Sequence, residues 1–146
     1  MSIVIDTPDG IAFAKAAARQ GALSLEIKTG LKKRGQTTYS IVKEVYGFRG
    51  SRESVLEDLT EYVEAELRLR KIPDEVFERI SKLTQELVDK LGERLTQVTF
   101  EDAIARAERA DAINHNTRQA MSDLFYVMIV RQNAEAREPI RTRKES

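Results

Sequence analysis

The residues YSIVKEVYGFRGSRESVLEDL, at positions 39–59, are the most informative about the fold. It reads as a short helix, a turn containing Gly47 and Gly50, and the beginning of a second helix, which is the outline of a helix-turn-helix. Thr37 or Thr38 suits the N-cap of the first helix, and Gly47 suits its C-cap, with Phe48 placed to fold back onto that helix. The second helix carries its apolar residues on one side, namely Val55, Leu56, Leu59, Tyr62, Val63 and Leu67.

A longer helix is predicted before this motif. Thr7, Pro8 and Asp9 are residues that favour a helix start, and Gly30 is placed to end the element. Its apolar positions follow a helical period along one face, which comprises Ile11, Ala14, Ala18, Ala22 and Leu25. Residues 23–28 also alternate like a strand, so both structures stay open there, and the abundant alanines favour the helix.

Three further helices are predicted after the motif. Pro73 begins the first, and its apolar stripe comprises Val76, Ile80, Leu83, Leu87 and Leu91. Residues 99–102 resemble a capping box in front of an alanine-rich helix that extends to about Ile113. Asn116 or Thr117 is the expected cap of the last helix, which extends to about Ala136.

The fold class predicted from these patterns is all-α. We expect a basic unit of three helices within residues 1–72 and an acidic helical hairpin or bundle over residues 73–138. Residues 139–146 are expected to form a disordered tail. The sequence leaves open whether the two helical parts pack together.

The composition narrows the classes of function. The 146 residues include no cysteine, which excludes disulfides, thiolate catalysis and zinc sites with cysteine ligands. The longest apolar run, residues 124–130, is too short for a signal peptide or a transmembrane helix, so a cytoplasmic or virion-associated setting is expected and no membrane partner. No motif points to a cofactor or to a small-molecule substrate.

The charge of the chain is balanced overall but unevenly distributed. Residues 28–52 contain seven Lys and Arg and one acid, whereas residues 53–138 contain 12 Lys and Arg and 19 Asp and Glu. The basic segment therefore predicts a site for the phosphate backbone of nucleic acid or for an acidic protein partner. The candidate binding residues are Lys28, Lys32, Lys33, Arg34, Lys43, Arg49 and Arg52. Acidic residues along the following helix disfavour reading of bases in the major groove.

Catalysis is not expected from this sequence. Residues 30–38, GLKKRGQTT, resemble a phosphate-binding loop, but Gln36 stands where that loop needs its lysine, and no later acidic strand can hold magnesium. His115 is the only histidine, so it cannot complete a metal site with a second His or Cys. We expect it to be a surface or capping residue.

Residues 124–130 form an uninterrupted apolar run. In a helix they would point in every direction, so they predict either a central core helix or a contact between subunits, and a buried strand is the minor alternative. Self-association is favoured, because Tyr and Met are enriched at interfaces. The candidate interface residues are Leu124, Phe125, Tyr126, Met128 and Ile129.

Residues 5 to about 63 also resemble a module of small uncharacterised bacteriophage and cyanobacterial proteins. The resemblance is carried by residues 5–8 (IDTP), 25–32 (LEIKTGLK), 39–44 (YSIVKE) and 47–50 (GFRG), and it extends to Val55. It implies a phage or cyanobacterial context and no particular activity.

Together, these features predict a non-enzymatic, oligomeric helical interaction or structural protein, of phage assembly or virion type. The alternative is a packaging or regulatory protein that contacts nucleic-acid phosphates without strong sequence specificity.

Overall fold

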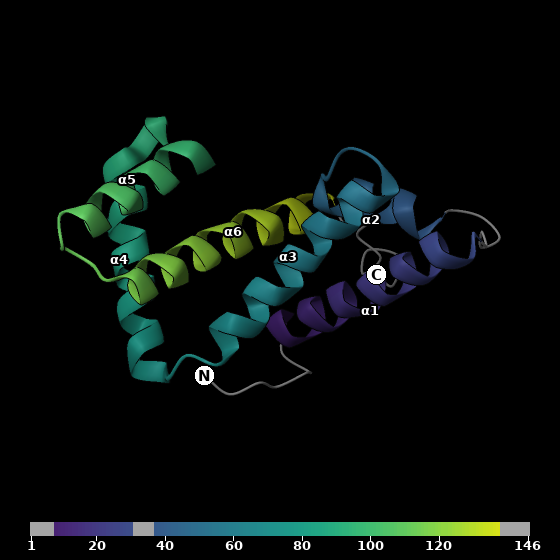
Figure 1. Ribbon diagram of the computed structural model, residues 1–146, viewed down its shortest axis with the longest axis horizontal. Coiled ribbons are helices and arrows are strands. Elements are labelled where there is room, and N and C mark those ends of the chain that lie inside the picture. The colour runs from purple at the N-terminus through teal and green to yellow at the C-terminus, as the bar shows by residue number, and fades with distance from the viewer. Residues whose placement is uncertain (1–7, 31–36, 138–146) are drawn as a thin grey trace, which may run out of the picture. The chain divides into compact units, whose positions relative to one another are not determined.

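The computed structural model describes residues 8–30 and 37–137, and all the regular structure in these ranges is helical (Figure 1). The elements in chain order are α1 (Pro8–Thr29), α2 (Thr38–Tyr46), α3 (Arg52–Arg70), α4 (Asp74–Leu91), the 3-10 turn η1 (Gly92–Arg94), α5 (Gln97–Arg109) and α6 (His115–Arg137). The all-α prediction is confirmed. Residues 23–28 and 124–130, for which the sequence also allows a strand, are both helical. No helix within the described ranges is both long enough and apolar enough to cross a membrane.

The chain forms two compact units, which we describe separately. The N-terminal unit comprises the described residues up to Val63 together with residues 129–137, and the central unit comprises residues 64–128. This division differs from the predicted boundary at residue 72. The reason is that α3 and α6 are continuous helices that each contribute residues to both units. The end of α6 belongs with the first helices, since Asn133 Nδ2 donates to the backbone oxygen of Tyr46 at 3.5 Å.

In the N-terminal unit, α1 is joined to α2 by a carboxylate cap. Glu26, which is only 8% exposed, accepts hydrogen bonds from the backbone N–H groups of Thr38 (2.9 Å) and Tyr39 (3.2 Å). Thr37 is the N-cap of α2 and accepts from Ser40 N at 3.1 Å. Three of the N–H groups that a helix start leaves without helical partners are thus satisfied, and a negative charge lies at the positive end of the helix dipole.

The buried face of α1 is not the one predicted. Ile11 and Leu25 are 44% and 61% exposed, and Ala14 and Ala18 are exposed as well, whereas Ala16 and Leu23 are fully buried. The predicted stripe is therefore wrong as a core face. Apolar residues surround this alanine-rich helix on several sides, so their period does not define one face. The face that packs is the one that carries Leu23 and the capping Glu26.

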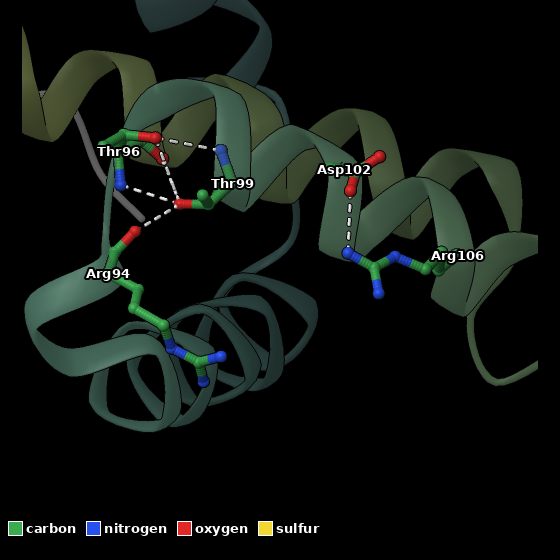
Figure 2. A network of polar contacts seen from close by, with 5 residues as sticks. All are labelled: Arg94, Thr96, Thr99, Asp102 and Arg106. Atoms are coloured by element: carbon green, nitrogen blue, oxygen red, sulfur yellow. Dashed lines mark hydrogen bonds and ion pairs between the residues drawn. The ribbon is translucent and has the colours of Figure 1, made fainter.

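In the central unit, η1 and a capping box connect α4 to α5 (Figure 2). The N-cap is Thr96, whose hydroxyl accepts from Thr99 N at 3.0 Å, and Thr99 Oγ1 accepts from Thr96 N at 2.8 Å. Thr99 Oγ1 also lies 2.8 Å from the backbone oxygen of Arg94, to which it donates. The predicted box at residues 99–102 is thus displaced by three residues. The box was misplaced because the side chain that closes it, at the third helical position, is the hydroxyl of Thr99, whereas glutamate or glutamine is the usual residue there.

The connection from α5 to α6 is held by a cluster around Glu108. Glu108 Oε1 accepts from Arg118 Nη1 at 2.7 Å, and Glu108 Oε2 lies 3.3 Å from His115 Nδ1. The hydrogen bond from Arg118 is the main cause that holds the pKa of Glu108 below its ordinary value; burial opposes it, and the contact with His115 lowers the pKa to a lesser extent. The cap of α6 is Asn114, whose side-chain oxygen accepts from Thr117 N at 2.8 Å, and not Asn116 or Thr117 as predicted.

A bidentate ion pair joins the last turns of α3 to α6 inside the central unit. Arg68 Nε and Nη2 donate to the two oxygens of Asp123 at 2.8 and 2.9 Å, and Gln119 Nε2 adds a third bond at 3.1 Å. Asp123 is only 4% exposed. A buried carboxylate needs such donors, because its desolvation is otherwise strongly unfavourable.

Glu26→Ala should destabilise the protein by about 1–2 kcal/mol, because it removes the side-chain acceptor of two N–H groups at the start of α2. Thermal unfolding followed by circular dichroism measures this effect. Glu64→Ala, at an exposed position of α3, is the matched control and should change stability by less than about 0.5 kcal/mol. Equal melting curves for the two variants would contradict the role given to Glu26.

Asp123→Asn should cost about 2 kcal/mol in urea unfolding, since it breaks a pair with one deeply buried partner, although Arg68 is 42% exposed and therefore partly screened. The control is Asp102→Asn, which breaks a pair with Arg106 of similar length (2.7 Å) whose side chains are 60% and 67% exposed. This second change should cost at most about 0.5 kcal/mol. The prediction fails if the two substitutions have the same effect.

Arg118→Ala should raise the pKa of Glu108 toward the ordinary glutamate value, as seen in a carbon-13 NMR titration of its side-chain carboxyl. A lowered native pKa means that the charged carboxylate stabilises the fold above the unfolded-state pKa, and that this contribution is lost as the pH falls through the native pKa. The destabilisation caused by Arg118→Ala should accordingly shrink in acid. A titration of Glu108 that is the same in both proteins would rule this out.

Candidate anion-binding site

The turn between α2 and α3 is shaped by two glycines. Gly47 has φ +74° and its N–H donates to the backbone oxygen of Lys43 at 2.9 Å, which closes the C-terminus of α2. Gly50 has φ +110°, a conformation that residues with a Cβ rarely adopt. Phe48 stacks on Tyr46 with a centroid distance of 5.6 Å, as expected for a hydrophobic C-cap. Arg49, which follows Phe48 in this turn, is exposed.

Gly47 also has a close neighbour, Arg137. A Cβ built on Gly47 would lie 2.5 Å from Nη1 of Arg137, in the last turn of α6. The guanidinium of Arg137 thus lies directly against the backbone of the turn. A side chain at position 47 would require this guanidinium, the far end of a flexible side chain, to move aside.

An open pocket of about 480 Å³ lies at this turn, within the N-terminal unit. Three cationic side chains and one acidic side chain, Glu44, take part in its lining. The cations are Lys43 on α2, Arg49 in the turn and Arg137 on α6. A lysine ammonium and two guanidiniums present many N–H donors and no acceptor, so the excess of positive charge suits a carboxylate or a phosphate.

Tyr39 organises a fourth cation beside the pocket. Its hydroxyl donates to the backbone oxygen of Gly50, and its ring lies 5.0 Å from Lys43 Nζ and 4.8 Å from Arg52 Cζ, measured to the centroid. The ring face attracts both cations. Tyr39, which lines the pocket, thus contacts two cations, of which Lys43 is itself a lining residue.

The predicted binding residues are only partly brought together. Lys43 and Arg49 line the pocket, and Arg52 lies on the ring of Tyr39, which also lines it. Lys28 is exposed in the last turn of α1 and is not part of the lining. The remaining three, Lys32, Lys33 and Arg34, lie outside the described residues.

Among the three cations that line the pocket, Arg137 is the one that the sequence did not indicate. It stands far along the chain from the basic segment, in a part whose charge is acidic on balance, and only the return of α6 to the α2–α3 turn brings it there. The sequence gives one weak indication of this contact, since Gly47 is a glycine at a helix end, where another side chain can approach the backbone.

The exposed side of α3 is acidic. Glu53, Glu57 and Glu61 are exposed on this helix. Partial burial, with the neighbouring charge of Glu57 as a second cause, raises the pKa of Asp58 above its ordinary value. This concentration of negative charge disfavours an extended nucleic-acid backbone along α3, in agreement with the sequence-based argument.

The candidate interface residues on α6 fall into two groups. Leu124 and Phe125 are buried at 8% and 4% exposure, and Phe125 stacks on Phe100 with a centroid distance of 4.1 Å. The core-helix alternative accounts for these two. Tyr126, Met128 and Ile129 are half-buried. Self-association through them stays a prediction, which the mass of the protein in solution tests.

The described residues contain no group of three or more His, Asp or Glu side chains that could hold a metal ion. His115 is largely exposed and lies beside Glu108, in the place expected for a surface histidine. The chain matches no protein-family model, and comparisons with curated proteins and with solved structures gave no match. The candidate site accordingly depends on geometry and charge alone.

Proposed function

We propose that this chain is a non-enzymatic helical interaction protein whose N-terminal unit binds an acidic group of a protein partner. The observation that carries the proposal is that Lys43, Arg49 and Arg137 line one pocket, together with Tyr39, on whose ring Arg52 lies. Cations that are kept close together by the fold stabilise an anion more than scattered surface charges do, because less side-chain entropy is lost on binding.

An acidic protein segment suits this site better than a long duplex. The pocket is local, and α3, which follows the turn, carries exposed carboxylates, so a partner that inserts one or two carboxylates avoids the repulsion that a phosphate backbone continuing along α3 would meet. The resemblance of residues 5 to about 63 to phage and cyanobacterial proteins supports a role in phage assembly or in the virion.

Binding of nucleic-acid phosphates is the second candidate. It is favoured by the helix–turn–helix course of α2 and α3, which places Arg49 and Arg52 at the turn and at the start of α3. In this case the cations would contact the backbone without reading sequence.

Fluorescence anisotropy with labelled poly-glutamate and with a labelled DNA duplex separates the two candidates. Poly-glutamate should bind the wild-type protein, and Lys43→Glu/Arg49→Glu should weaken this binding by about tenfold or more, since two attractive charges become repulsive. The control is Lys71→Glu/Arg79→Glu, which makes the same charge change at exposed positions outside the pocket and should have little effect.

The outcomes are distinguishable. Duplex binding that is lost in the pocket variant and falls steeply with salt, without binding of poly-glutamate, would establish the nucleic-acid alternative. Binding of neither probe at low salt, or equal losses in the pocket and control variants, would refute the site.

A further inference from the structure

A second cavity, of about 590 Å³, lies wholly inside the central unit and is separate from the anion-binding pocket. Its walls come from α4, η1, α5, the α5–α6 connection and the first turns of α6. The volume falls in the range of about 300–1,000 Å³ that is typical of ligand sites. The cavity is partly open to solvent, so it is a groove and not an enclosed core void.

The floor and one wall of the groove are apolar. Ile104 and Met121 are almost fully buried at its floor. Leu83, Leu87 and Leu91 line α4 at intervals of four residues, and each of them is only half-buried. A row of leucines at this spacing forms the ridge against which another helix packs. The other elements of the central unit therefore cover these three leucines of α4 only in part.

The rim of the groove carries an excess of positive charge. Lys90, Arg94 and Arg106 take part in the lining, with Glu86 as the acid among them. Arg106 is paired with Asp102 at 2.7 Å (Figure 2). Within residues 8–30 and 37–137, the side chains of Lys90 and Arg94 form no ion pair. This contrasts with the central unit as a whole, where thirteen Asp and Glu outnumber ten Lys and Arg.

We propose that this groove binds an amphipathic helix of a partner protein that carries carboxylates beside its apolar stripe. The charge complementarity selects this occupant. An apolar stripe alone would fit any helix, but two cations without ion pairs at the mouth of the groove favour acidic flanks and disfavour basic ones. Leucine-type side chains at helical spacing would fill the space between α4 and α5, in the helix-in-groove manner.

Two synthetic peptides of about four helical turns test the proposal. They share leucines at helical spacing on one face and differ only in the flanking positions, which are glutamate in one peptide and lysine in the other. Calorimetric titration into the full chain should show about tenfold tighter binding of the glutamate peptide, with a preference that weakens at high salt.

Charge reversal at the rim provides the decisive variant. Lys90→Glu/Arg94→Glu should invert the preference, so that the lysine peptide becomes the tighter ligand. Arg79→Glu/Lys82→Glu reverses two charges at exposed positions of α4 that do not line the groove, and it should leave the preference unchanged. Because the inversion is a gain of binding for one peptide, misfolding of the variant cannot imitate it.

The proposal is overturned if the two peptides bind wild type equally, if neither binds, or if the reversed rim keeps the original preference. Binding of dodecanoate without binding of either peptide would also overturn it, since the occupant would then be an acyl chain. The peptides are titrated into full chains that also carry Lys43→Glu/Arg49→Glu, so that the anion-binding pocket does not contribute to binding of the glutamate peptide. These outcomes are then independent of the poly-glutamate and DNA measurements, which concern a different unit of the chain.

Discussion

The cap that Glu26 places on α2 is the contact on which the N-terminal unit depends. One carboxylate on α1 accepts from the first N–H groups of α2, so the direction in which α2 leaves its N-terminus is fixed by a residue of the preceding helix. The direction of α2 in turn positions Tyr39, Lys43 and the turn at Gly47. A helix of nine residues is only marginally stable by itself, so α2 depends for its stability on the cap and on the buried side chains of Val42 and Val45.

The helical fold and most helix ends could be predicted from the sequence, because they depend on local chemistry. Thr37, Gly30 and Gly47 act within a few residues of where they stand, and Pro73 marks the start of α4 as expected. The caps of α5 and α6 were misplaced by two or three residues, since neighbouring Thr and Asn residues are chemically equivalent candidates. Local pattern gives the type of cap but does not choose between such neighbours.

The candidate site could be predicted only in part, because some of its residues are brought together by tertiary packing and not by local chemistry. Lys43, Arg49 and Arg52 are close in sequence and therefore close in space once the turn forms. Arg137 and the buried face of α1 depend on tertiary packing, which composition and period do not encode for a helix as rich in alanine as α1. The two units likewise divide within continuous helices, where no proline, glycine or change of composition marks a boundary.

The contact between Arg137 and Gly47 has a consequence for the order of events during synthesis. The α2–α3 turn leaves the ribosome long before the last turn of α6, and N-terminal segments of a chain usually fold first. The third cation of the pocket is therefore added only when residue 137 has emerged. A shorter nascent chain would have the turn without the charge of Arg137, so it would bind an anion less tightly than a chain in which residue 137 has emerged.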